Sequence, residues 1–148
     1  MHEFTSSATI PCSPPSLRSV LGDPRQLPEI SDPDLELEVL SAPEQVTEDT
    51  VIEFRISAHG FRQRMQHRYV EVSEFQIVAE QIEGPTRAWI HRQTIVANDD
   101  GTCTLTDHVQ FEPPGGMMGF VLTADRIRES LEEGMAFRYE ALRQICGT

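Results

Sequence analysis

The chain has 148 residues, of which 39% are hydrophobic and 24% are charged, and its formal net charge is −12 at pH 7. These proportions are those of a soluble globular protein, and the length predicts a single domain over residues 1–148. Because the 24 acidic residues outnumber the 12 basic ones, phosphate backbones and anionic lipid surfaces would repel the chain. We therefore expect no nucleic-acid partner and no membrane insertion, and no apolar run approaches the about 20 residues of a bilayer span.

The N-terminal segment and the cysteines give the expected compartment. MHEFTSSATIPC has neither a basic start nor an apolar stretch of signal-peptide length, which predicts a cytoplasmic protein. Cys12, Cys103 and Cys146 are widely spaced and form no CxxC motif, so we interpret them as free thiols. The histidines are scattered, without HxxxH or HExxH spacing. We expect neither a metal nor a cofactor.

The N-terminal third predicts one strand followed by two short helices. Residues 3–10 form the expected strand, which Pro11 ends. Residues 13–16, Ser-Pro-Pro-Ser, predict a helix start, because serine caps helices and proline fits the first turn. Residues 22–24, Gly-Asp-Pro, end this helix and begin a second brief helix that continues to Ile30.

From residue 35 apolar residues alternate with polar ones, as is typical of half-buried strands. We predict strands that start at Leu35 and cover residues 50–59, 62–72 and 75–83. Along two of these strands, one face carries Phe54 and Ile56 or Met65, His67 and Tyr69. Short turns connect the strands, which favours an antiparallel meander.

Residues 84–112 predict a long β-hairpin. Its turn, residues 98–101, is Asn-Asp-Asp-Gly, with Asn at the first position of a type I turn and Gly where the backbone becomes left-handed. This turn places Gln93 opposite Asp107. One face then carries Trp89, His91, Gln93, Ile95, Leu105, Asp107, Val109 and Phe111. An apolar face with a few polar groups is either a core with satisfied polar side chains or the wall of a pocket.

Residues 120–145 contain no proline and predict a long amphipathic helix. Its expected stripe toward the sheet is Ala124, Ile127, Leu131, Met135, Arg138, Leu142 and Ile145. At 1.5 Å per residue the helix is about 39 Å long, and no other segment is long enough to cover the face of the sheet.

Three groups of residues resemble motifs of one bacterial superfamily. Against D/E-Q-x-x-G-P-hydrophobic-R-x-W-x-H, the matching residues are Glu80, Gln81, Gly84, Pro85, Arg87, Trp89 and His91. Against G-T-x-x-x-D-x-V-x-Y they are Gly101, Thr102, Asp107, Val109 and Phe111, and against F-x-Y-R-x-x-x-L they are Met135, Phe137, Arg138 and Leu142. The chain thus resembles the SRPBCC or START-like superfamily of polyketide cyclases, dehydrases and lipid carriers. It departs from the superfamily pattern at Thr86, where an aromatic residue is usual, at Gln93, where a second histidine often occurs, and at Met135, where Phe is common. The spacing from Thr102 to Asp107 is also one residue longer than in the pattern.

The resemblance implies an α+β helix-grip fold, with a curved antiparallel sheet of about seven strands and one long C-terminal helix packed over it. It also implies a cavity between sheet and helix, typically of about 300–1,000 Å³ for a small-molecule site. From the expected faces, the predicted ligand-binding residues are Phe54, Ile56, Met65, Tyr69, Trp89, His91, Gln93, Val109, Phe111, Leu131, Met135 and Arg138.

Three functions remain open, one of which is a structural or interaction module that meets a protein partner through the sheet edge or the acidic surface. The preferred one is a non-catalytic monomer or homodimer that binds or carries a hydrophobic or amphipathic small molecule. The alternative is a cyclase or dehydratase in which His91 acts as acid or base and Asp107 orients it. The same pair also fits a purely structural role, bracing the sheet beneath the helix, with Arg138 as the expected partner of Asp107 or Glu80. Since no Ser, Cys or second base accompanies His91, binding without catalysis is favoured.

Overall fold

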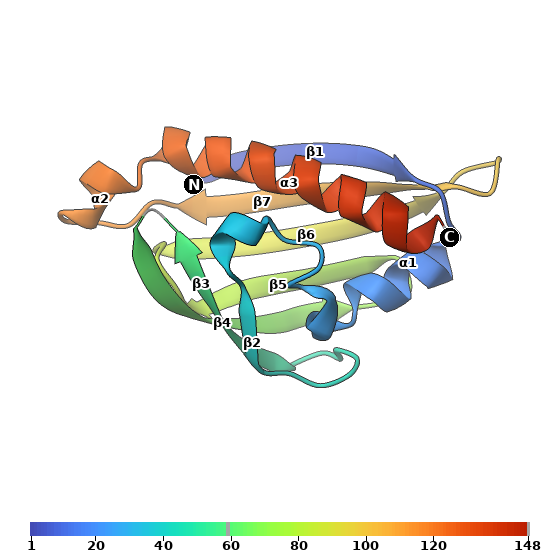
Figure 1. Cartoon of the computed structure of the whole chain (residues 1–148), viewed down its shortest axis with the longest axis horizontal. Coiled ribbons are helices and arrows are strands. Elements are labelled where there is room, and N and C mark those ends of the chain that lie inside the picture. The colour runs from blue at the N-terminus through green and yellow to red at the C-terminus, as the bar shows by residue number, and fades with distance from the viewer. Residues whose placement is uncertain (59, 148) are drawn as a thin grey trace.

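The computed structural model describes residues 1–58 and 60–147. Strands and helices are largely segregated along the chain, as expected for an α+β protein (Figure 1). In chain order the elements are β1 (His2–Ile10), α1 (Pro14–Leu21), η1 (Pro24–Gln26), η2 (Pro33–Leu35), β2 (Glu38–Ser41), β3 (Val51–Ala58), β4 (Phe61–Val72), β5 (Gln76–Glu83), β6 (Ala88–Ala97), β7 (Cys103–Glu112), α2 (Met118–Val121) and α3 (Ala124–Cys146). The elements η1 and η2 are single 3₁₀ turns.

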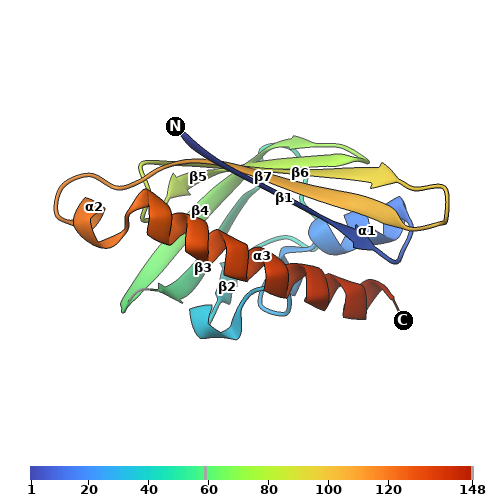
Figure 2. The same cartoon turned by 90° about the horizontal axis from the view of Figure 1, so that it is seen from above.

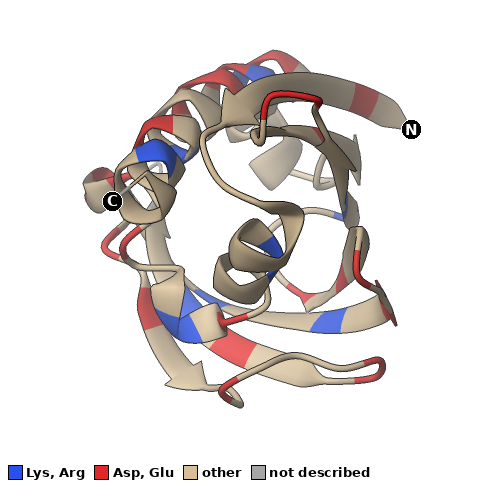
Figure 3. Cartoon of the chain, turned by 90° about the vertical axis from the view of Figure 1, so that its right-hand side faces the viewer, with Lys and Arg blue, Asp and Glu red and all other residues tan. Residues whose placement is uncertain are grey.

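The seven strands form one antiparallel sheet in the order β1-β7-β6-β5-β4-β3-β2. The sheet curves, and α3 runs along its inner side (Figure 2). Viewed end-on, the strands bend around the space in which α1 and α3 lie (Figure 3). The predicted helix-grip fold is confirmed.

The β6–β7 hairpin has the register that its turn predicts. Asn98 donates its backbone N–H to the carbonyl of Thr102 at 2.9 Å, and Gly101 takes the left-handed conformation with φ 88°. Gln93 lies opposite Asp107, and successive residues of β7 are alternately buried and half-buried, so that its apolar face is buried along the whole strand. Local turn chemistry therefore fixes which side chains of this hairpin face the helix.

The start of β2 differs from the sequence prediction. Leu35 ends the η2 turn instead of starting a strand, and β2 begins at Glu38. The Asp32 carboxylate accepts the N–H of Asp34 at 2.9 Å, so this cap, with Pro33 in the first turn, outcompetes the short apolar alternation. The predicted end of the next strand at residue 59 lies outside the described residues.

The C-terminal helix begins later than predicted, at Ala124, and residues 118–121 form the separate turn α2. Thr123 caps α3, because its hydroxyl accepts the N–H of Arg126 at 3.2 Å. The residues that α3 buries are Ile127, Leu131, Met135, Tyr139 and Leu142. Tyr139 replaces the predicted Arg138 in the buried set, and Ile145 is 37% exposed.

Candidate ligand-binding site

A cavity of about 730 Å³ lies between the curved sheet and α3. Strands β3 to β6 supply one wall, α3 supplies the opposite wall, and the segment from α1 to η2 contributes leucine and isoleucine side chains such as Leu21, Leu27 and Ile30. The volume falls within the range of small-molecule sites, and most of the wall is apolar.

The structure brings most of the predicted lining residues to this cavity. Ten of the twelve lie on its wall, namely Phe54, Ile56, Met65, Tyr69, Trp89, His91, Gln93, Leu131, Met135 and Arg138. The other two, Val109 and Phe111, are 0% exposed and do not line it. They belong to β7, whose neighbour is the edge strand β1, and Phe111 packs between His2, with ring centroids 5.4 Å apart, and Trp89, at 6.3 Å. Placing them on the cavity wall was wrong.

Sequence reasoning missed several lining residues. The segment between α1 and β2 contributes apolar side chains to the cavity wall, and the hydrophobic pattern of the sequence did not identify them as lining residues. His67 and Gln81 also line the cavity. For His67 a signal existed, because it alternates with Met65 and Tyr69 along one face of β4.

His91 and Asp107 form the pair that the hairpin register predicts. The Nε2 atom of His91 lies 2.6 Å from Oδ1 of Asp107, and the carboxylate is 0% exposed whereas the imidazole reaches the cavity. The Tyr139 hydroxyl donates to the other carboxylate oxygen at 2.8 Å and lies 2.6 Å from the Ser6 hydroxyl. Gln93 adds a longer contact of 3.4 Å. Asp107 thus sits behind the wall with both oxygens engaged.

The electrostatics keep Asp107 ionised. Burial alone would raise the pKa of its carboxyl, but the hydrogen bond and charge of His91 oppose this, with further contributions from Arg138 and Tyr139, so that the pKa lies below its ordinary value. A carboxylate accepts, and His91 therefore donates its Nε2–H to it. Burial and the neighbouring carboxylate raise the pKa of Tyr139, which remains a donor.

Arg138 does not make the contact expected of it. Tyr139, the next residue along α3, holds Asp107, and Glu80 pairs with Arg68. Successive helical residues point about 100° apart, so Tyr139 meets the sheet while Arg138 projects into the cavity, half-buried. Its guanidinium makes no hydrogen bond or ion pair with any described residue.

His67 carries a polar atom without a partner. Among the described side chains, Nε2 of His67 is the only buried nitrogen or oxygen atom that has no hydrogen-bond partner. The ring packs edge-on against Phe54, with centroids 5.0 Å apart and planes at 79°. Burial, with a smaller contribution from the charge of His91, lowers the pKa of His67 to about 4. The imidazole is therefore neutral near pH 7.

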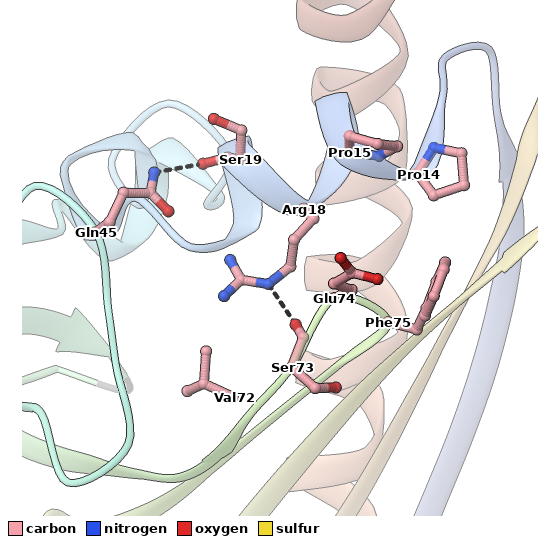
Figure 4. A pocket seen from close by; sticks show the side chains of 9 residues that line it. All are labelled: Pro14, Pro15, Arg18, Ser19, Gln45, Val72, Ser73, Glu74 and Phe75. Carbon is pink, nitrogen blue, oxygen red and sulfur yellow. Dashed lines mark hydrogen bonds between the residues drawn. The ribbon is translucent and has the colours of Figure 1, made fainter.

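A second recess of about 480 Å³ lies between α1 and the turn that joins β4 to β5 (Figure 4). Arg18 donates to the carbonyl of Ser73 at 2.7 Å, and Gln45 donates to the carbonyl of Ser19 at 2.9 Å. These two hydrogen bonds to backbone carbonyls hold α1 and the loop before β3 against the sheet.

With this fold and cavity in place, comparison with known proteins defines the class of protein. Residues 1–144 match the model of the polyketide cyclase / dehydrase and lipid transport family. The chain belongs to this family. A search of curated proteins finds no match, and no helix among the described residues is long and apolar enough to cross a membrane.

Solved structures resemble the chain in fold at low sequence identity. A START superfamily protein from Mycobacterium smegmatis superposes with a TM-score of 0.77 at 13% identity, over 99% of this chain and 98% of that one. An aromatase/cyclase from Streptomyces sp. R1128 gives a TM-score of 0.73 at 19% identity, over 99% of this chain and 93% of its own. These similarities establish the START-like architecture.

Proposed function

We propose that the protein binds or carries a hydrophobic or amphipathic small molecule between the sheet and α3. The observation that carries this proposal is the cavity of about 730 Å³ with a largely apolar wall. Membership of a family that includes lipid transport proteins supports it. Burial of apolar ligand surface supplies the main driving force for such binding.

Gly134 offers a direct test, because it lines the cavity and a Cβ added there would meet no atom within 4 Å. Because the Cβ position is open, a Gly134→Phe substitution would place a ring at the cavity wall. We expect it to weaken the binding of a neutral fluorescent probe, 1-aminoanthracene, by about tenfold or more, since a filled site excludes the ligand sterically. Probe fluorescence in a titration measures the affinity.

The matched control is Gly134→Ala, which adds a single methyl group. It should leave the probe affinity within about threefold of the original and stabilise the helix by about 1 kcal/mol, because alanine is the better helix former. Equal probe binding by Gly134→Phe and Gly134→Ala would contradict ligand binding in this cavity.

The His91–Asp107 pair favours a second candidate, an acid–base enzyme of the cyclase or dehydratase type. The 2.6 Å contact orients an imidazole at the cavity wall, and the matching aromatase/cyclase fold is compatible with such chemistry. With Nε2–H donated to Asp107, Nδ1 of His91 is the nitrogen available to take a proton. Deuterium incorporation from heavy water into an enolisable 1,3-diketone tests this, and a rate unchanged in His91→Gln would rule His91 out.

A further inference from the structure

Three residues of the cavity wall lie in one row across the sheet. Ala79 of β5 is paired with His91 of β6 on one side and with Tyr69 of β4 on the other. All three line the cavity, and the central one carries only a methyl group. The larger side chains of His91 and Tyr69 therefore border a recess above Ala79.

Two donors beside this recess have no partner within the described residues. The Tyr69 hydroxyl makes no hydrogen bond there, although the side chain is only 7% exposed. Burial raises the pKa of Tyr69 to about 12, so the phenol keeps its proton. Arg138 interacts electrostatically with Tyr69 and with the buried Asp107, which places its positive charge close to the same row.

The other arginines show that this isolation is unusual in the chain. Nine of the twelve guanidinium groups hydrogen-bond or ion-pair with described residues. The remaining three are Arg62, Arg87 and Arg138. In a chain of net charge −12 acidic partners are abundant, yet Arg138 points into the cavity without contacting one.

Among the described residues, Arg138 is also the one charged group of the inner wall that is free to contact a ligand. The other charged lining residues are Asp32, Asp34, Arg62 and Glu133. All but the first are exposed to solvent, and the Asp32 carboxylate caps η2. Solvent screens exposed charges, whereas a half-buried guanidinium acts at lower effective dielectric.

We propose that Arg138 and Tyr69 bind the carboxylate of an amphipathic carboxylic acid whose apolar body fills the cavity. The planar guanidinium presents five N–H donors in a fork that matches a carboxylate, and the Tyr69 hydroxyl adds one more. The His91 N–H is already donated to Asp107, so this ring borders the head group without binding its charge. The inference rests on the proposed ligand-binding function and adds the chemical class of the ligand.

The test compares acids with alcohols of equal chain length. Saturated carboxylates from octanoate to hexadecanoate, and the corresponding 1-alkanols, are titrated while the fluorescence of Trp89 is followed, because this is the chain's single tryptophan and it lines the cavity. Arg138→Met should lower the affinity for carboxylates by about ten- to hundredfold, as expected for a lost charge-assisted hydrogen bond. The same substitution should leave alkanol affinity within about twofold, since it keeps the apolar stem.

Two further variants make the result specific. Arg126→Met removes the same charge from the exposed side of α3, away from the cavity wall, and should change neither affinity by more than about twofold. Tyr69→Phe should weaken carboxylate binding by about three- to tenfold and spare the alkanols.

The outcomes separate the two proposals. If Arg138→Met weakens acids and alkanols equally, or weakens neither, the carboxylate assignment is overturned while ligand binding in the cavity stands. If no acid and no alkanol binds the original protein, the cavity proposal itself fails. Loss of carboxylate binding in both Arg138→Met and Arg126→Met would show a general charge effect and would likewise overturn the assignment.

Discussion

The two halves of the sheet's concave side differ in whether their polar groups have hydrogen-bond partners within the protein. In the packed half, next to β1 and β7, Asp107 contacts three side chains, and Tyr139 links it to Ser6. In the hollow half, along β4 and the facing side of α3, neither His67 Nε2 nor the Arg138 guanidinium has a hydrogen-bond partner among the described residues.

The difference separates structural polar groups from groups available to a ligand. Burying a polar group without a hydrogen bond is unfavourable by about 1–3 kcal/mol. In the packed half, the folded chain itself supplies the hydrogen-bond partners. In the hollow half, a bound molecule or ordered water is needed to supply them. Substitutions in the packed half should therefore change stability, and those in the hollow half should change ligand binding.

The largest effect on stability should come from Asp107→Asn. The substitution keeps the size of the side chain but removes the charge and one acceptor, leaving His91 or Tyr139 without its partner. We expect the free energy of unfolding to fall by about 2–3 kcal/mol, as measured by urea denaturation at pH 7. Asp100→Asn, in the exposed hairpin turn, provides the control and should change stability by less than about 1 kcal/mol. Similar losses in both variants would contradict a special role for the packed network.

The pKa shift of Asp107 also predicts how the stability of the protein changes with pH. Because the folded pKa of Asp107 lies below its unfolded value of about 4, the unfolded chain takes up the proton first as the pH falls. The stability that the carboxylate supplies is therefore present above about pH 4 and is lost as the pH falls through the folded pKa. The difference between the original protein and Asp107→Asn should shrink over this acidic interval.

The chain's two tyrosines form a matched pair for an effect of intermediate size. Tyr139→Phe removes the hydroxyl that joins Asp107 to Ser6 and should lower the free energy of unfolding by about 1 kcal/mol. Tyr69→Phe removes a hydroxyl that faces the hollow half and should change stability by less than about 0.5 kcal/mol. Urea denaturation of both variants measures this, and equal losses would erase the distinction between the two halves.

The smallest effect at neutral pH should come from His67→Leu, which removes the unsatisfied Nε2. We expect the variant to be as stable as the original protein at pH 7.5, or more stable by less than about 1 kcal/mol. The pKa of His67 is about 4 in the folded protein, against an ordinary value of 6.5. The stability that depends on a neutral imidazole at this position is therefore fully present above pH 6.5 and is lost as the pH falls toward 4. The advantage of His67→Leu should grow from pH 7 to pH 5, and an advantage independent of pH would contradict the buried, neutral imidazole.

The fold was predictable largely because the local turn and helix signals of the sequence agree with its overall hydrophobic pattern. The turn at residues 98–101 determines the register of β6 and β7, and that register brings His91 to Asp107. The long helix follows from its apolar periodicity. Prediction failed at Leu35, where a capped 3₁₀ turn replaced a strand, because such a turn depends on a few hydrogen bonds that apolar alternation does not record.

The candidate site was predictable only in part. Spacing along a helix allows either residue 138 or residue 139 to share a stripe with Met135 and Leu142, since intervals of three and four both fit. Only the curved sheet, which faces the helix on more than one side, decides that Tyr139 packs and Arg138 reaches the cavity. Likewise, alternation shows that Val109 and His67 face inward but does not tell packed core from cavity wall, which depends on where α3 and the short helices settle.

The position of β1 has a consequence for how the chain folds as it is made. This strand comes first in the sequence, yet its neighbour in the sheet is β7, with His2 paired to Phe111. At synthesis rates of about 5–20 residues per second, its partner strand emerges about 5–20 seconds later. Until then β1 is unpaired, and closure of the sheet around α3 waits for contacts far apart in sequence, which slows folding. A chain stopped before residue 103 would lack both β7 and the helix that covers the cavity.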